Sequence, residues 1–188
     1  MSRVIPVVGM DPSMNHWGIC IGTFDLDTKK LQVKELSVVE PVVPKGKAVR
    51  QNSKDIEAAK QLTAAAVEAI RKAKVTFVEV PVGSQSARAM ASYALCVGVL
   101  GALRAGGLQF IEVTPKEVKV AAIGNDTASK KEMIEWAIAK HPEANWPTHT
   151  RQGVKLISEG KAEHMADATA AIYAGLKTDQ FQQLLAFL

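Results

Sequence analysis

Cysteine is scarce in this sequence, because the only two residues are Cys20 and Cys96, and both lie within apolar stretches. Small secreted domains that depend on disulfide bonds carry many more cysteines for their length. Two thiols among apolar neighbours are typical instead of small core side chains in a reducing compartment. The scarcity of cysteine therefore argues against a disulfide framework and predicts a cytoplasmic protein.

The pattern of a leader peptide or a membrane span is also missing. The first residues show no basic start followed by an apolar stretch and a cleavage site. The small-residue stretch from Ala87 to Gly107 contains Arg88, Arg104 and several glycines, which is a poor composition for a membrane helix. We therefore expect neither export nor membrane insertion.

No repeat or low-complexity linker divides the 188 residues. A chain of this length can bury about two-thirds of its unfolded surface in one core, and 47% of the residues are hydrophobic, which suffices to fill it. We therefore expect a single domain spanning residues 1–188. The 23 Lys and Arg residues exceed the 19 Asp and Glu residues by a formal charge of +4, which favours a polyanionic partner only weakly.

Apolar periodicity predicts strands in the first part of the chain and alternating helices and strands after it. Runs of β-branched or alternating apolar residues predict strands at Val4 to Met10, His16 to Phe24, Leu31 to Val39, Val75 to Val80 and Leu108 to Val113. Apolar spacings of three and four predict helices at Ser53 to Ala73, with Ser53 as N-cap, at Ser84 to Arg104, after Thr114-Pro115, at Thr127 to Ala139 and at Lys161 to Leu176. A three-stranded antiparallel meander followed by such alternation predicts an α/β fold with one five-stranded mixed sheet.

Three acidic residues stand where charge is disfavoured. Asp11 ends the first apolar strand, Glu79 lies near the end of the fourth, and Asp167 is inside an otherwise apolar helix. No Lys or Arg lies within three residues of any of them. Burying an unpaired carboxylate costs several kcal/mol, and two carboxylates about 4 Å apart repel by about 4 kcal/mol at an effective dielectric near 20. If the fold brings these acids together, a divalent cation is the simplest compensation.

His164 precedes Asp167 by three residues, so both project from one side of a helix. Oxygen ligands with a single imidazole suit Mg²⁺ or Mn²⁺, whereas Zn²⁺ prefers Cys and His. Each residue also has an ordinary alternative role. Asp11 can cap a turn, Glu79 can form an ion pair, His164 can be structural, and Glu163 can be a solvated residue near the helix start. The combination of Asp11, Glu79, His164 and Asp167 is less expected by chance than any one of them.

Several short motifs occur in the order found in RuvC-type Holliday junction resolvases. They are Val8-Gly9-Met10-Asp11-Pro12-Ser13 with Trp17-Gly18, Phe77-Val78-Glu79, Ser86-Ala87-Arg88-Ala89, Thr114-Pro115 with Val118-Lys119, Gly124 with Ala128-Ser129-Lys130-Lys131, and His164-Met165-Ala166-Asp167-Ala168. The chain therefore resembles this family from Val7 to Gly175. It departs from the family at Ser13, where Gly is usual, and after Glu79, where no aromatic residue follows to engage the junction.

The resemblance implies a ribonuclease-H-like fold and a metal-dependent DNA endonuclease acting in recombination and repair. Such an enzyme resolves four-way junctions by paired symmetric nicks that leave 5′-phosphate and 3′-hydroxyl ends. By resemblance, Asp11, Glu79, His164 and Asp167 are the catalytic and metal-binding residues, with two Mg²⁺ or Mn²⁺ ions per site. A homodimer would present two matched sites to a near-twofold substrate. The divergence suits a phage or organellar branch of the family. We expect the protein in the cytoplasm or at the nucleoid, and in the host cytoplasm if it is encoded by a phage.

The same motifs supply candidates for DNA contacts, namely Lys119, Lys130, Lys131, Arg88 and Ser86. Lysines at such positions would hold the phosphodiester backbone without reading its sequence, and ordinary helix-surface lysine is the alternative. The segments Pro44 to Lys54 and His141 to Lys161 could each touch a junction arm or be solvated. Trp146 could stack on a base or, in the alternative we favour, pack over the core.

The helix predicted from Ser84 to Arg104 is the best candidate for a dimer contact, because its small residues would let another helix approach closely. A buried central helix is the alternative. Two other functions stay open. An actin-like nucleotide-binding protein would use Asp11 near a metal–phosphate complex, but it normally has two such domains and glycine-rich phosphate loops. A junction-binding protein that has lost catalysis would keep the fold without needing the acids.

Overall fold

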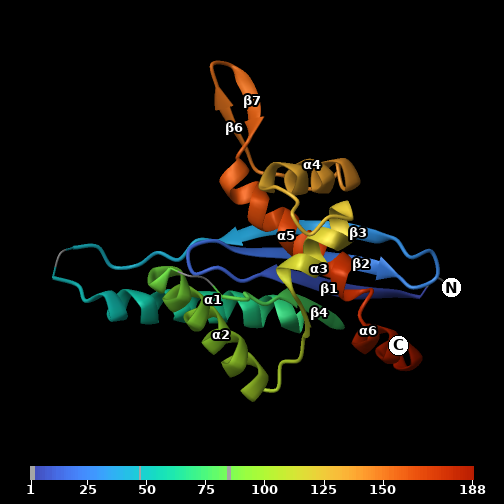
Figure 1. The fold of residues 1–188 in the computed structure, drawn as a ribbon, viewed down its shortest axis with the longest axis horizontal. Helices are drawn as coiled ribbons and strands as arrows, with labels where there is room; N and C mark the ends of the chain where they lie inside the picture. Colours follow the sequence, from blue (N-terminus) through green and yellow to red (C-terminus); the bar gives the residue numbers. More distant parts are fainter. Residues whose placement is uncertain (1–2, 47, 84–85) are drawn as a thin grey trace.

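A mixed sheet forms the centre of the computed structural model, which describes residues 3–46, 48–83 and 86–188. Its strands are β1 (Val4–Asp11), β2 (Trp17–Asp25), β3 (Leu31–Val39), β4 (Val75–Glu79) and β5 (Ile111–Val113). They lie in the order β3-β2-β1-β4-β5 (Figure 1). The first three strands pair antiparallel, whereas β4 is parallel to β1 and β5 is parallel to β4. The five-stranded mixed α/β sheet expected from the sequence is therefore confirmed.

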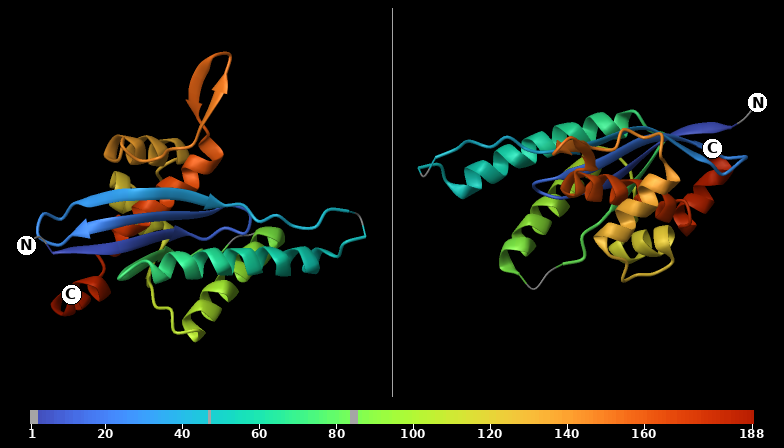
Figure 2. Two further views of the ribbon diagram at one scale, coloured as in Figure 1. Left: turned by 180° about the vertical axis from the view of Figure 1, so that it is seen from behind. Right: turned by 90° about the horizontal axis from the view of Figure 1, so that it is seen from above.

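Helices cover both faces of this sheet. They are α1 (Gln51–Arg71), α2 (Ala87–Ala105), α3 (Pro115–Ile123), α4 (Lys130–Lys140), α5 (Glu159–Gly175) and α6 (Asp179–Leu184), followed by the short 3₁₀ helix η1 (Leu185–Phe187). Even-numbered residues of β1, such as Val8, pack with α1 and α2. Odd-numbered residues, such as Val7, pack with α5, which crosses the other face of the sheet (Figures 1 and 2). The period of two along a strand thus separates the two layers.

Close packing of α5 on the sheet depends on glycines. A Cβ atom at Gly9 of β1 would lie 2.0 Å from the carbonyl oxygen of Ala168, and one at Gly175 of α5 would lie 1.9 Å from the Phe77 ring. Both distances are far below van der Waals contact. The helix therefore reaches its depth over β1 and β4 only because these positions lack side chains.

Several helix starts differ from the sequence-based expectation. α1 begins at Gln51 after Arg50, without a side-chain cap, so Ser53 as its N-cap was wrong. α2 begins at Ala87, with the Ser86 side chain accepting a hydrogen bond from the Ala89 amide, whereas Ser84 lies outside the described residues. Thr114 caps α3 as expected, through a capping box with Glu117. The helix ends thus follow local capping more closely than apolar periodicity does.

The segment between α4 and α5 forms a hairpin that apolar periodicity did not predict. Its strands are β6 (Thr148–Arg151) and β7 (Val154–Ile157), which pair only with each other as a separate two-stranded sheet. Figure 1 shows the hairpin projecting away from the central sheet. Residues at every position of β6 and at all but the last position of β7 are exposed. Because neither face is buried, the hairpin lacks the alternation by which strands are recognised.

Helix α2 is not the buried central helix that was one alternative. Its inner side packs on the sheet through Cys96, Val99, Leu100 and Leu103. The outer side is apolar and open, with Met90 43% and Val97 47% exposed. Space is also open at Gly98 and Gly101, where an added Cβ would meet nothing within 4 Å. Among the described residues, no helix combines the length and apolar character needed to cross a membrane.

Candidate active site

Strand alternation places two of the predicted acids on the face covered by α5. In β1, Val7 packs in the core beneath α5, so Gly9 and Asp11 face the same side. In β4, Phe77 packs in that core, and Glu79 follows it on the same face. The parallel register sets Gly9 opposite Phe77. Asp11 and Glu79 therefore emerge at the same level, where two neighbouring strands end.

Helix α5 brings the other two predicted residues to this edge of the sheet. His164 Nδ1 donates a hydrogen bond to Oδ2 of Asp11 at 2.6 Å. The side chains of His164 and Asp11 are only 19% and 13% exposed. Gly18 of β2, opposite Asp11, makes this approach possible, because a Cβ there would lie 2.1 Å from the His164 carbonyl oxygen.

One cavity of about 240 Å³ collects all four predicted catalytic residues in its wall. Its lining includes Asp11, Glu79, His164 and Asp167, together with Ser13, Tyr93, Pro115 and Glu163. Asp11 and His164 are 153 positions apart in the sequence, so the fold brings distant parts of the chain together at this cavity. Glu163 was expected to be solvated, but its side chain is only 19% exposed. The cavity therefore holds four carboxyl groups and one imidazole.

Two carboxyl groups of this cavity, those of Glu79 and Asp167, resist ionisation. Burial, followed by the charges of Asp11 and Asp167, raises the pKa of Glu79 well above its ordinary value. Burial, followed by the charges of Asp11 and Glu163, raises the pKa of Asp167 from 3.8 to about 8. The nearby Lys119 ammonium opposes both shifts. The cluster therefore carries more acid than the surrounding cations offset.

His164 responds in the opposite sense. Burial lowers its pKa, but the hydrogen bond to Asp11 and the charges of Asp11, Glu163 and Asp167 raise it, and the net shift is upward. The imidazolium form is thus stabilised by the same excess of carboxylates. In the metal-free protein, a proton on His164 offsets part of the charge that a divalent ion would otherwise offset.

The donor set suits a hard divalent cation. Carboxylate oxygens with one imidazole are the ligands that Mg²⁺ and Mn²⁺ accept, and the raised pKa values show that extra positive charge would be favourable here. In the described part of the chain, however, no three His, Cys, Asp or Glu side chains already converge on a position for an ion. His164 is turned toward Asp11 instead. Metal binding would require this hydrogen bond to rearrange.

A second histidine, which was not predicted as a site residue, lies against the site. The ring of His16 stacks on that of His164, with centroids 5.5 Å apart and planes 10° from parallel. His16 Nε2 lies 3.4 Å from Glu40 Oε1, and Glu40 also pairs with Lys161 of α5. These contacts link the β1–β2 turn to α5, so His16 is placed to hold the orientation of the His164 ring.

The predicted DNA-contacting lysines are distributed unevenly around the cavity. Lys119 is partly buried in α3 and close enough to influence the pKa of Glu79 and of Asp167. Lys130 forms an ion pair with Glu163 at 2.7 Å, at the rim of the cavity. Lys131 is 80% exposed and lies 3.7 Å from Glu135 of its own helix. A role in DNA contact stays a prediction for all three.

The other two predicted contacts lie apart from the cavity that contains Asp11 and Asp167. Arg88 lines a separate cavity of about 380 Å³ between the starts of α1 and α2, where Lys54 also lies. The Ser86 hydroxyl caps α2, which gives it a local structural role. Trp146 packs against the core, and its indole N–H donates to the His141 carbonyl at 2.8 Å. The packing interpretation of Trp146 therefore holds.

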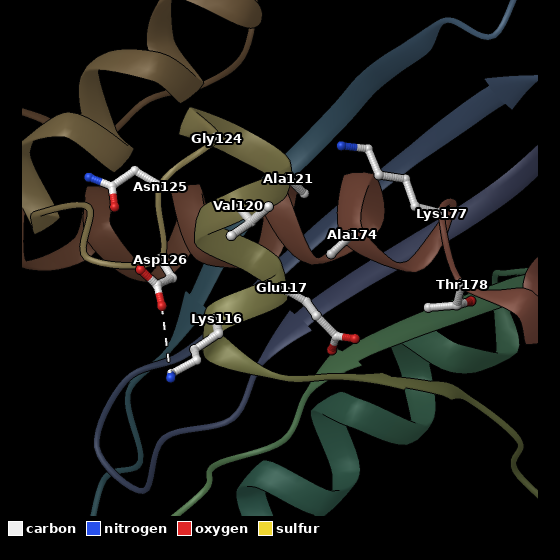
Figure 3. Close-up of a pocket in the computed structure, with 10 residues that line it drawn as sticks. All are labelled: Lys116, Glu117, Val120, Ala121, Gly124, Asn125, Asp126, Ala174, Lys177 and Thr178. Carbon is white, nitrogen blue, oxygen red and sulfur yellow. Dashed lines mark ion pairs between the residues drawn. The ribbon is translucent and has the colours of Figure 1, made fainter.

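Another cavity lies elsewhere, between α3, the α3–α4 connection and the end of α5 (Figure 3). It measures about 530 Å³. Its carboxylates are already engaged, because Asp126 lies 3.8 Å from Lys116 and Glu117 forms the capping box of α3. Positive and negative side chains are mixed there, so the lining favours no single class of ligand.

Comparison with solved structures shows that the fold is ribonuclease-H-like, and that the chain is similar in structure to RuvC. It is similar to "T. thermophilus RuvC in complex with Holliday junction substrate", with a TM-score of 0.62 and 19% identity over 92% of this chain and 96% of that chain. It is also similar to a second Thermus thermophilus RuvC structure, with a TM-score of 0.60 and 19% identity over 92% of each chain. No family model and no curated protein matches the sequence. The expected RuvC-like fold is therefore confirmed.

Proposed function

We propose that this protein is a structure-selective DNA endonuclease that resolves four-way junctions. The observation that carries the proposal is the single cavity lined by Asp11, Glu79, His164 and Asp167. Buried carboxyl groups that lie close together destabilise a fold by their mutual repulsion, so a purely structural role does not explain this cluster. The RuvC-like fold supports a nuclease, and one of the similar RuvC structures contains a Holliday junction substrate.

The four side chains would hold the metal cofactor, two Mg²⁺ or Mn²⁺ ions. Bound divalent ions at such a site activate a water for attack on the phosphate and stabilise the leaving oxygen. The protein's own contribution is to hold the ligands in place. Gly18 sets the depth of α5 over β2, and His16 stacks on His164. Lys119 and Lys130 lie near the acids and would attract the phosphate that the acids alone would repel.

We further propose that the active form is a homodimer. The open apolar side of α2, with Val97 exposed between Ala94 and Gly101, is the surface that supports this proposal. A near-twofold junction requires two related cuts, and a twofold dimer presents two matched sites.

A synthetic four-way junction tests the proposed reaction directly. With Mg²⁺ or Mn²⁺, the purified protein should nick the junction in symmetric pairs, and DNA ligase should reseal the products. Linear duplex of the same sequence should be largely spared. Equal cutting of linear and branched DNA would leave a general nuclease and exclude a resolvase.

The two alternative functions give different results in the same preparation. A junction-binding protein without catalysis would bind the branched DNA but cut nothing with either ion, and isothermal titration would detect no divalent-ion binding without DNA. An actin-like protein would hydrolyse ATP in the absence of DNA.

A further inference from the structure

The β6–β7 hairpin is a two-stranded ribbon with a defined register. Its register pairs Thr148 with Ile157 and Arg151 with Val154, which leaves Gln152 and Gly153 as a two-residue turn. Both turn residues have positive φ, 50° and 80°, as a type I′ turn requires. This turn has the twist of the strands it joins, so it fixes the register. The hairpin projects away from the rest of the chain in Figure 1 and in the left view of Figure 2.

The base of the ribbon is fastened to the helix that carries the catalytic candidates. The Ser158 amide donates to the Pro147 carbonyl at 2.8 Å and closes the hairpin at its base. Trp146 and Ile157 pack against Ala162 and other buried residues of α4 and α5. Because α5 begins at Glu159 and carries His164 and Asp167, the direction of the ribbon is fixed relative to the catalytic cavity.

The ribbon is positively charged and its cations are unused. From Ala144 to Ser158 the sequence contains no Asp or Glu, whereas it contains Arg151 and Lys155. Neither of these two side chains forms an ion pair with any residue that the structure describes, although Lys130, Lys131 and Lys161 all do. Free cations on a projecting ribbon complement a polyanion.

One face of the ribbon also exposes apolar side chains. Cross-strand partners share a face, so Arg151 and Val154 lie on the same side as His149 and Leu156. Val154 is 57% exposed and Leu156 is 41% exposed. An isolated two-stranded hairpin is marginally stable in water, and open aliphatic side chains add nothing to its stability. Arg151 lies on this face, whereas Lys155 and its partner Thr150 lie on the other. Aliphatic side chains that are exposed beside a cation fit a surface that is covered when a partner binds.

From these observations we infer that the β6–β7 hairpin is a wing that lies along a duplex arm of the DNA substrate. Arg151 and Lys155 contact the phosphodiester backbone, while Val154 and Leu156 face a groove. A two-stranded ribbon fits the major groove of B-DNA, which is about 12 Å wide. The inference rests on the proposed function, because it takes branched DNA as the substrate, and it adds a contact surface outside the catalytic cavity.

Salt dependence of binding provides the test, using the full-length protein and a fluorescent four-way junction in EDTA to prevent cleavage. Each phosphate contact adds about 0.9 to the slope of log affinity against log salt concentration. The double variant Arg151→Ala with Lys155→Ala should therefore reduce this slope by about 2 and weaken binding by about 10- to 100-fold at 0.1 M salt. The matched control is Lys30→Ala with Lys34→Ala, which removes the same charge from exposed positions of the β2–β3 region and should preserve the wild-type slope.

A shortened hairpin tests the apolar part of the wing. Deleting Thr150, Arg151, Val154 and Lys155 removes two cross-strand pairs and joins His149 and Leu156 through the original Gln152-Gly153 turn, which preserves the register. This variant should keep the wild-type melting temperature, because the packed base is untouched. It should bind the junction more weakly than the double alanine variant.

The outcomes separate the wing from the proposed function. If wild-type protein binds and cuts junctions while the charge variant keeps the full salt slope, the wing inference is overturned and the proposed function stands. If wild-type protein does not bind junctions, both fail. If shortening the hairpin changes the oligomeric state instead of the DNA affinity, the ribbon contacts a second copy of the chain and the inference is again overturned.

Discussion

At the scale of single residues, the proposed metal site would couple the binding of a divalent ion to the release of protons. Asp167, with a pKa near 8, retains its proton at neutral pH in the metal-free protein, and the pKa of Glu79 is also raised. A divalent ion must displace these protons to gain its ligands. The affinity for Mg²⁺ should consequently rise as the pH increases toward 8, and binding should release protons into the buffer.

The same shift predicts how stability depends on pH. Between about pH 4 and pH 8, folded Asp167 holds a proton that the unfolded chain has released, because its pKa rises from 3.8 to about 8 on folding. By linkage, stability falls as the pH rises through this window and levels off above it. In EDTA, the melting temperature of the wild type should fall across this range more steeply than that of Asp167→Asn. Each kcal/mol of unfolding free energy that the wild type loses should lower its melting temperature by about 2–4 °C. Parallel pH profiles of the two proteins would contradict a protonated, buried Asp167.

If Asp11 is a catalytic residue, replacing it should abolish DNA cleavage without preventing junction binding. Asp11→Asn keeps the size of the side chain and still allows a hydrogen bond from His164, but it removes a ligand charge. The cleavage rate should fall by orders of magnitude, because one lost ligand disturbs both metal occupancy and the aligned water. Junction affinity, measured in EDTA, should persist or increase, since a negative charge facing the phosphates is gone.

Asp27→Asn is the matched control for this change. Asp27 is exposed and pairs with Arg3 near the β2–β3 turn, apart from the cavity. Its replacement should leave cleavage at the wild-type rate. A folded, junction-binding Asp11→Asn protein with full activity would exclude Asp11 from the catalytic residues.

At the scale of secondary-structure elements, the depth of α5 on the sheet determines whether the site forms. Gly18→Ala would set a Cβ 2.1 Å from the carbonyl oxygen of His164, so α5 must move outward. Since α5 carries His164 and Asp167, we expect cleavage to fall at least about 100-fold, the scale expected for misplacing reacting groups by about 1 Å. The melting temperature should also fall, as overpacking typically costs about 1–3 kcal/mol.

Gly160→Ala on the same helix is the control for this prediction. An added Cβ at Gly160 meets nothing within 4 Å, and alanine favours helix by about 0.5–1 kcal/mol over glycine. This variant should be as stable as the wild type or more so, with unchanged cleavage. If Gly18→Ala retained full cleavage, the position of α5 would not limit the reaction.

Elements with a buried face could be predicted from the sequence, whereas exposed ones could not. β3 matches its expected bounds, Leu31–Val39, because buried and exposed residues alternate along it. Its alternation changes phase between Val33 and Leu36, where the register against β2 shifts at a bulge. The β6–β7 hairpin carried no such alternation, since both faces are exposed.

The candidate site shows the same division. Asp11, Glu79 and Asp167 were found because a carboxyl group inside an apolar run is costly, and that cost is visible in one short segment of sequence. His16 was missed because its role depends on contacts with Glu40 and His164, from parts of the chain that only the fold brings together. Spacing along the sequence cannot reveal such a contact.

At the scale of the whole molecule, the outer side of α2 is the surface whose exposure most needs a partner. Ala94, Val97, Gly98 and Gly101 follow one another at helical spacing and are all exposed. Small residues at this spacing allow a second helix to approach closely, and burying the apolar stripe would stabilise a dimer by about 25 cal/mol for each Å² of apolar surface covered. The RuvC-like fold would then present two cavities related by a twofold axis.

Charge introduced into this stripe tests the dimer. Val97 is 47% exposed, so Val97→Glu should not disturb the folded monomer, but in a closed helix–helix contact it would bury two carboxylates near the twofold axis. Sedimentation should show the wild type as a dimer and Val97→Glu as a monomer with an unchanged melting temperature. The control is Val4→Glu, since Val4 is 50% exposed at the opposite end of β1 from Asp11.

The same variant tests whether the two cuts are coupled. Each monomer keeps its own cavity, so Val97→Glu should still nick junctions with Mg²⁺. The two cuts should lose their coupling, and a circular substrate should accumulate singly nicked product. A variant that stays dimeric, or a monomer that still makes paired cuts at the wild-type rate, would remove α2 from the dimer contact.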